Sequence, residues 1–144
     1  MKYEIEKLFE EGDDLLKESK SKFYLQKEEH CGASCSCCCA LKKYLDAYEM
    51  FLFEFIKPSE NYHVLLHTIT QKDPEFNDFN EKIFKVKCFA DESKKEGEGF
   101  FIYPDEVNDV LKIVVEIRNY IGKKVGLSSE FLQESRKISE ILAL

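Results

Sequence analysis

Residues 39–56 have the sequence CALKKYLDAYEMFLFEFI, in which apolar residues return every three or four positions. The main stripe consists of Leu41, Leu45, Tyr48, Leu52 and Phe55, and it is widened by Tyr44, Ala47, Phe51 and Phe53. This spacing predicts an α-helix, and a helix that is apolar over most of its circumference lies at the centre of a bundle. We therefore expect a central helix over residues 32–56. Pro58 should end it, because the residue before a proline is biased out of the helical conformation.

The same periodicity predicts helices on both sides of this stretch. They cover residues 2–20, 60–70 and 105–121, with a further helix that begins at Asp73 and a short terminal one from Ser128. No alternation of strand and helix patterns is present, and no internal repeat. The expected architecture is one all-α domain over residues 1–144, an up-and-down helical bundle of four to five main helices with short helices added.

Local signals mark the ends and crossings of these helices. Residues 73–75 (Asp-Pro-Glu) combine an N-cap carboxylate, a proline at the first helical position and an acid in the first turn. Gly122 and Gly126 are expected to stop the long last helix. Gly12 lies on the apolar face of the first helix, where glycine is unfavourable by about 1 kcal/mol relative to alanine. Its position therefore indicates a close helix crossing.

A charged segment separates the last two long helices. Residues 91–99 (DESKKEGEG) contain two glycines among charged side chains, so we expect a mobile loop over residues 91–104 that leads into the final long helix. The aromatic residues that follow, Phe100, Phe101 and Tyr103, either join the core or line a cleft or partner face.

The composition is that of a globular domain with an acidic balance. Of 144 residues, 21 are Lys or Arg and 28 are Asp or Glu, which gives a net charge of −7. Broad binding to a nucleic acid backbone needs concentrated positive charge, so we exclude that class of partner. The most apolar run, within residues 48–56, contains two glutamates and is too short to cross a membrane. Residues 1–7 lack the apolar core of a secretory signal, and we expect a cytoplasmic protein with no membrane partner.

Five of the six cysteines fall within residues 31–39. Neighbouring cysteines such as those at 37–39 rarely meet the geometry of a disulfide, so reduced thiols are expected. A metal hypothesis gathers His30, Cys31, Cys35 and one of the three consecutive cysteines around zinc. The spacing matches none of the usual frameworks, and buried cysteine packs as a small hydrophobe. We therefore favour core packing over metal binding or redox sensing, and we expect no cofactor.

His63 and His67 are four residues apart and share one face of the expected helix. A zincin motif requires glutamate directly after the first histidine, where this chain has Val64. Half-buried histidine is therefore the interpretation that we favour, with His63 kept as a binding candidate.

Three short blocks occur in order along the chain: CALKKYLDAY at residues 39–48, YHVLL at 62–66 and YPDE at 103–106. Together they resemble the HEPN domain (higher eukaryotes and prokaryotes nucleotide-binding). The first block is similar to the lysine-containing second helix of that family. The second is similar to its histidine followed by leucines, and the third to its Tyr-Pro turn before the long last helix.

This resemblance implies a groove between the central helices and the Tyr-Pro turn, frequent homodimerisation and, in some relatives, a separate nucleotidyltransferase partner chain. The expected function is that of a non-catalytic helical module that binds a nucleotide or a partner protein. The candidate binding residues are Lys42, Lys43, His63, Tyr103 and Arg118. The two lysines are equally well explained as surface charge. Arg118 is expected either to bind a phosphate or to pair with Glu116 or Glu106.

Two departures from the family pattern argue against catalysis. Ile102 stands where many relatives have an arginine before the Tyr-Pro pair. The nuclease branch has an arginine, a polar residue and then a histidine, and Arg118-Asn119 fits only the start, because residues 123–125 are Lys-Lys-Val. Lysine is normally protonated and cannot replace the imidazole as a base. The alternatives are a degenerate ribonuclease of the toxin type, in which Arg118 and Asn119 persist, and a cysteine-based metal or thiol sensor.

Overall fold

The computed structural model describes residues 2–25, 30–54, 62–93 and 104–127, and each of these segments is essentially helical. The elements are α1 (Lys2–Leu25), α2 (His30–Phe53), α3 (Tyr62–Lys72), the 3₁₀ helix η1 (Pro74–Phe79), α4 (Asn80–Ser93) and α5 (Pro104–Val125). The predicted all-α helical bundle is confirmed. The expectation of a loop over residues 91–104 was wrong at its ends, because residues 91–93 belong to α4 and Pro104 begins α5. Residues 94–103 and the terminal helix expected from Ser128 lie outside the described residues.

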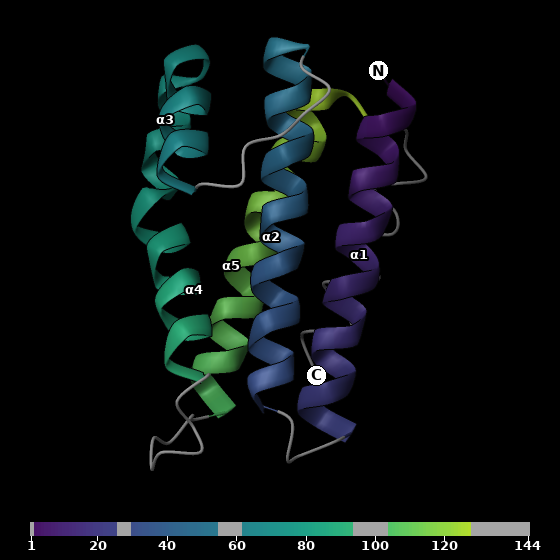
Figure 1. Cartoon of the computed structure of the whole chain (residues 1–144), viewed down its shortest axis with the longest axis vertical. Helices are drawn as coiled ribbons and strands as arrows, with labels where there is room; N and C mark the ends of the chain where they lie inside the picture. Colours follow the sequence, from purple (N-terminus) through teal and green to yellow (C-terminus); the bar gives the residue numbers. More distant parts are fainter. Residues whose placement is uncertain (1, 26–29, 55–61, 94–103, 128–144) are drawn as a thin grey trace.

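Helix α2 is the central element of the bundle. It lies between α1 on one side and α3 and α4 on the other, with α5 behind it (Figure 1). Leu41, Tyr44 and Leu45 have no exposed surface, and the buried set continues along α2 through Tyr48 and Met50. The central position predicted from the wide apolar stripe is therefore confirmed.

The end of α2 differs from the expectation. The helix stops at Phe53, well before Pro58, because Glu54 adopts a left-handed conformation with a φ of 59°. The Glu54 amide still donates to the Met50 carbonyl at 2.8 Å, so the last turn is closed at this residue. Proline was therefore the wrong signal for this helix end.

Helix α5, in contrast, ends later than the expected residue 121. Gly122 is inside the helix, and the chain leaves it at Gly126, whose φ is 69°. The Gly126 amide donates to the Lys123 carbonyl and the Leu127 amide donates to the Gly122 carbonyl, at 3.3 and 3.2 Å. This pair of bonds is a Schellman motif, which uses the left-handed freedom of glycine at the position after the cap.

Gly12 lies at the crossing of α1 and α2, as its position in the sequence indicated. A Cβ atom at Gly12 would lie 2.6 Å from Cε1 of Tyr44, which is closer than van der Waals contact allows. The missing side chain lets the Tyr44 ring lie against the backbone of α1.

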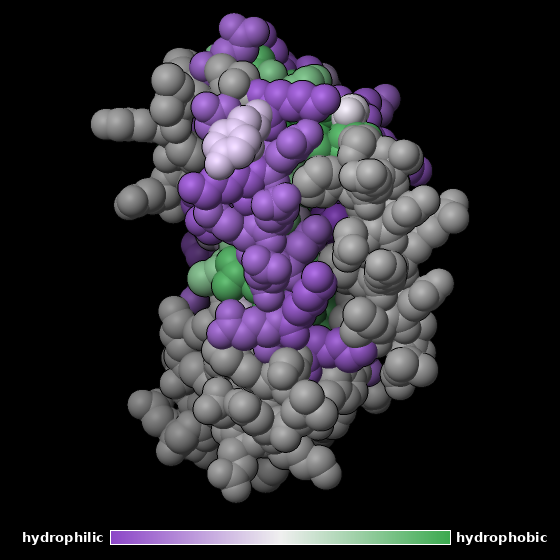
Figure 2. All heavy atoms as spheres, turned by 90° about the vertical axis from the view of Figure 1, so that its right-hand side faces the viewer, coloured by the Kyte–Doolittle hydropathy of each residue, from purple (hydrophilic) through white to green (hydrophobic). Residues whose placement is uncertain are grey.

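Polar residues cover the outer side of α1. Figure 2 shows this side of the molecule, and its described residues are mainly hydrophilic. No helix in the described segments is long and apolar enough to cross a membrane.

Candidate functional site

Arg118 lies inside the bundle. Only 1% of its surface is exposed, and its guanidinium holds the Asp13 carboxylate in a bidentate ion pair, with Nε to Oδ1 at 2.6 Å and Nη2 to Oδ2 at 2.7 Å. The Tyr44 hydroxyl donates a third hydrogen bond to Asp13 Oδ1, at 2.5 Å. The cluster joins α1, α2 and α5. The expectation that Arg118 pairs with Glu116 or Glu106 was wrong, because the bundle brings a carboxylate from the distant α1 to it.

The electrostatics of this cluster keep Arg118 and Tyr44 each in one protonation state. Burial lowers the pKa of Arg118, but the hydrogen bonds and charge of Asp13 outweigh burial and raise it overall. Burial and the neighbouring Asp13 carboxylate raise the pKa of the Tyr44 hydroxyl well above its usual range. Arg118 therefore stays charged and Tyr44 stays a donor, as a buried ion pair requires.

A second buried carboxylate connects the other end of α2 to α5. Asp73, directly before η1, accepts hydrogen bonds at Oδ2 from the hydroxyls of Tyr48 and Tyr120, both at 2.6 Å. Its side chain makes no N-cap hydrogen bond, so the predicted capping role was wrong. The chain still turns into a helix here, with Pro74 in its first turn, but that helix begins as 3₁₀ and becomes α-helical only at Asn80.

The two candidate lysines are held in ion pairs on the surface of the bundle. Lys42 Nζ lies 2.5 Å from Asp46 Oδ1 within α2, and Lys43 Nζ lies 2.9 Å from Glu11 Oε2 of α1. Neither points toward His63 in a shared site. Tyr103 lies outside the described residues.

The three consecutive cysteines of α2, Cys37 to Cys39, occupy three different environments. Cys37 belongs to the hydrophobic core, Cys38 lies at its margin and Cys39 is exposed. Burial, followed by the neighbouring Cys38 thiol, raises the pKa of Cys37, which keeps it protonated. The Tyr62 hydroxyl donates to the Cys38 carbonyl at 2.9 Å.

No metal site is visible in the part of the chain that the structure describes. Within the described residues, no group of three or more His, Cys, Asp or Glu side chains could hold a metal ion. The side chains of His30, Cys31 and Cys35 lie outside the described part of the structure.

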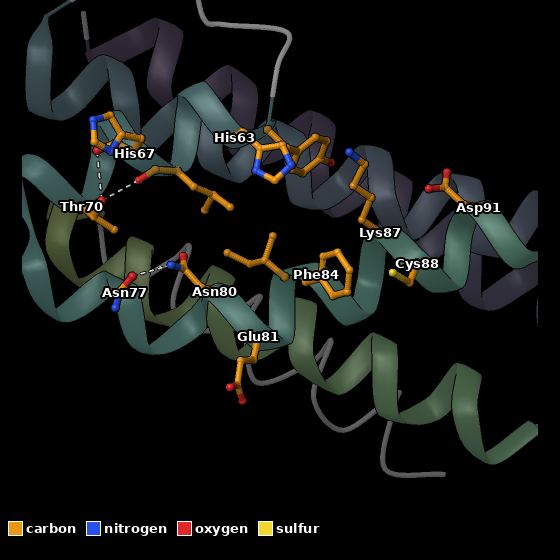
Figure 3. Close-up of a pocket in the computed structure, with 13 residues that line it drawn as sticks. His63, His67, Thr70, Asn77, Asn80, Glu81, Phe84, Lys87, Cys88 and Asp91 are labelled. Carbon is orange, nitrogen blue, oxygen red and sulfur yellow. Dashed lines mark hydrogen bonds between the residues drawn. The ribbon is translucent and has the colours of Figure 1, made fainter.

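His63 lines a groove of about 630 Å³ between α3 and the η1–α4 segment, which we call the α3/α4 groove (Figure 3). Lys87 of α4 lies beside the start of α3, with Nζ 5.7 Å from the centre of the Tyr62 ring. At the other end of the groove, Asn80 Nδ2 donates to Asn77 Oδ1. Asn80 Oδ1 is buried and has no hydrogen-bond partner among the residues that the structure describes. The groove therefore combines apolar walls with a pair of hydrogen-bonded asparagines at one end.

A second groove lies on the other flank of α4. It has a volume of about 550 Å³ and is lined by residues of α4 and α5, and we call it the α4/α5 groove. Glu81, Phe84 and Cys88 line both grooves, so they form a ridge between them. Phe84 is 63% exposed, whereas Ile83 beside it is buried. We call Phe84 and the two grooves together the Phe84 surface.

Acidic side chains surround the Phe84 surface. Glu81, Asp91, Glu106 and Asp109 are exposed and line one groove or both, against Lys85 and Lys87. Figure 3 shows the Glu81 carboxylate pointing away from the space between α3 and α4. Among the described residues, none of these four acids forms an ion pair.

The sequence-predicted candidates do not converge on one site. His63 lines the α3/α4 groove, whereas Arg118 is buried against Asp13 between α1, α2 and α5. Phe84 was not among the candidate residues predicted from the sequence. Its position directly after Ile83 was the available signal, because successive residues of a helix point in different directions and a helix at the surface of a bundle buries only one face.

No protein-family model matches this chain, and no curated protein or solved structure is significantly similar to it. The site is therefore interpreted from its own geometry.

Proposed function

We propose that the chain is a non-catalytic, HEPN-like helical module that binds a partner protein through the Phe84 surface. The main supporting observation is Phe84 itself, a large aromatic side chain that is 63% exposed on a ridge between two grooves. Exposed apolar side chains bordered by polar residues are typical of protein interaction sites, and aromatic residues dominate their binding energy.

The charge of the surface favours a protein over a nucleotide. A phosphate needs concentrated positive charge or a bidentate arginine. The α3/α4 groove offers Lys87 against Glu81 and Asp91, and Arg118 is occupied by Asp13. Nucleotide binding, which the family resemblance implies, is thus the less well supported branch of this proposal.

The burial of Arg118 also supports a non-catalytic role. A ribonuclease arginine has to reach a phosphate of the RNA, and here the guanidinium is 1% exposed and neutralised by Asp13. Loss of RNA cleavage in Arg118→Ala would not identify a catalytic residue, because this substitution also leaves Asp13 buried without its cation.

Site-specific photo-cross-linking tests the proposal. A photoreactive phenylalanine analogue is placed at Phe84 in one variant and at Tyr3 in the other, and each is irradiated in the cells that make the protein. Tyr3 is the matched control, because it is an aromatic residue that is 73% exposed on α1, away from the Phe84 surface. We expect a discrete cross-linked protein from position 84 and none from position 3, because only position 84 lies in a docking surface.

Two results would contradict the proposal: no cross-linked protein at position 84, or the same products at both positions. A thermal-shift panel of nucleotides tests the other branch. A ligand at 100 times its dissociation constant stabilises the fold by about 2.7 kcal/mol, so binding would raise the melting temperature measurably.

A further inference from the structure

We infer that the α4/α5 groove receives a basic amphipathic segment of the partner, an inference that rests on the proposed protein-binding function. The groove has an apolar floor formed by the buried Phe89 and Val110, with Phe84 on the ridge at its edge. Among the described residues, its charged border consists of Glu81, Glu106 and Asp109 against one cation, Lys85. The floor fits apolar side chains, and the border fits Lys or Arg side chains on either side of them.

The border acids are available to an incoming cation. All three are exposed, and within the described segments none of them is neutralised by an ion pair. The nearby Lys82 is already paired with Glu116, with Nζ 2.9 Å from Oε2. Among the described residues that line the groove, a cation from a partner would therefore meet three unpaired carboxylates and a single lysine, Lys85. Complementary charge at the border of an interface mainly accelerates association and selects the partner.

A second copy of this chain is a poor occupant of the groove. In a two-fold symmetric dimer the same patch contacts itself, so Glu106 and Asp109 of one copy would approach the same acids of the other. Like charges facing one another across an interface oppose binding. The whole chain also carries a net charge of −7, which adds to the repulsion. The charge pattern therefore points to a different, basic partner.

Two synthetic amphipathic peptides test this inference. They have identical leucine positions, with lysine at the polar positions of one and glutamate at those of the other, and binding to the full chain is followed by fluorescence anisotropy. We expect the lysine peptide to bind at least tenfold more tightly and to weaken as salt is added, because border charges are screened.

Charge reversal locates the binding. Glu106→Lys with Asp109→Lys should weaken the lysine peptide by about tenfold, since two exposed attractions become repulsions. Glu10→Lys with Asp14→Lys is the matched control. These acids are exposed on α1, on the far side of α2 from α4, so this pair changes the net charge equally without touching the groove. The control should change the affinity less than twofold, and thermal melting confirms that both double variants fold.

The outcomes separate this inference from the proposed function. If both peptides bind equally and Phe84→Ala abolishes their binding, the inference of a basic partner is wrong, but the Phe84 surface is still a docking site. Equal weakening by both charge reversals would also overturn the inference, because it would show attraction to the whole acidic molecule. If neither peptide binds, or if Phe84→Ala leaves binding unchanged, the groove is not the docking site. A cross-link from position 84 to a second copy of the chain would overturn the basic partner directly.

Discussion

Asp13 is the most consequential single residue of the core. Its two carboxylate oxygens accept hydrogen bonds from Tyr44, Arg118 Nε and Arg118 Nη2, all between 2.5 and 2.7 Å. Removing a charge from water is expensive, and a buried ion is tolerated only when its partners satisfy it. The Arg118 side chain also lies 5.9 Å from the centre of the Phe9 ring, which encloses the pair on the α1 side.

We expect Asp13→Ala to lower the free energy of unfolding by about 3–5 kcal/mol, because it leaves Arg118 buried without a counter-charge. The double variant Asp13→Ala/Arg118→Met should cost much less than the sum of the two single variants, since no charge is then left unpaired. Urea unfolding of the four proteins measures this coupling.

The exposed Lys82–Glu116 pair is the control for this cycle. Its side chains are 44% and 51% exposed, so Glu116→Ala should change stability by less than about 1 kcal/mol. If Asp13→Ala costs no more than Glu116→Ala, the buried pair does not hold the three helices together.

Gly12 and Gly122 are both helical glycines, but they differ in how closely other side chains approach them. A Cβ atom added at Gly12 in α1 would meet the Tyr44 ring at 2.6 Å, whereas one added at Gly122 in α5 would have its nearest neighbours at 3.8 Å. Both glycines are buried and both lie within helices. Only Gly12 is needed for the close approach of two elements.

Alanine substitutions at these two positions should therefore change the stability in opposite directions. Gly122→Ala should stabilise the protein by up to about 1 kcal/mol, the difference in helix propensity. Gly12→Ala gains the same propensity but forces the Tyr44 ring and its hydrogen bond to Asp13 to move, and overpacking typically costs about 1–3 kcal/mol. Thermal melting of both variants checks the pair, and a stabilised Gly12→Ala would show that the α1–α2 crossing has room to adjust.

The way in which the stability of the whole molecule changes with pH depends on two buried carboxylates, Asp73 and Asp46. Burial raises the pKa of Asp73, but the hydroxyls of Tyr120 and Tyr48 and the charge of Lys124 outweigh it and lower the pKa overall. Burial raises the pKa of Asp46, and the neighbouring Lys42 only partly opposes this. The two groups therefore act in opposite directions when the protein is acidified.

Asp73 stabilises the fold fully above the ordinary carboxyl pKa of about 4, and this contribution is lost as the pH falls from there through the lower pKa of the folded state. We expect Asp73→Asn to be less stable than the parent protein by about 1–3 kcal/mol at neutral pH, because hydrogen bonds to a charged acceptor are lost. The difference should shrink as the pH falls below about 4, as followed by urea unfolding at several pH values.

Asp46→Asn serves as the control, because it should change the pH dependence of the stability in the opposite direction. The raised pKa of Asp46 means that the folded state takes up its proton first, so in the parent protein this group favours folding as the pH falls. Removing it should make the loss of stability in acid steeper. Parallel pH profiles for the two variants would contradict these assignments.

Hydrophobic periodicity was sufficient to predict the bundle and the central place of α2, because a wide apolar stripe has only one environment in which it can be buried. Helix ends were less predictable. Pro58 is a strong breaker, yet α2 ends at Phe53, before the left-handed Glu54. Asp73 has the sequence of an N-cap but accepts hydrogen bonds from two tyrosines. A local sequence signal indicates which interactions a residue is able to make. The residues that the fold brings next to it determine which of these interactions form.

The pattern of apolar and polar residues established the helices and the core stripe of α2, because these depend on neighbours three or four positions away. Glycine on an apolar helix face indicated a close crossing at Gly12, but the residue that crosses there, Tyr44, comes from another helix. The partner of Arg118 lies 105 residues away, and the exposure of Phe84 depends on where α3 and α5 meet α4. Such contacts join segments with no local relation, so they exist only once the helices have packed. The candidate docking surface therefore exists only in the folded bundle, as does the buried ion pair of Arg118 with Asp13.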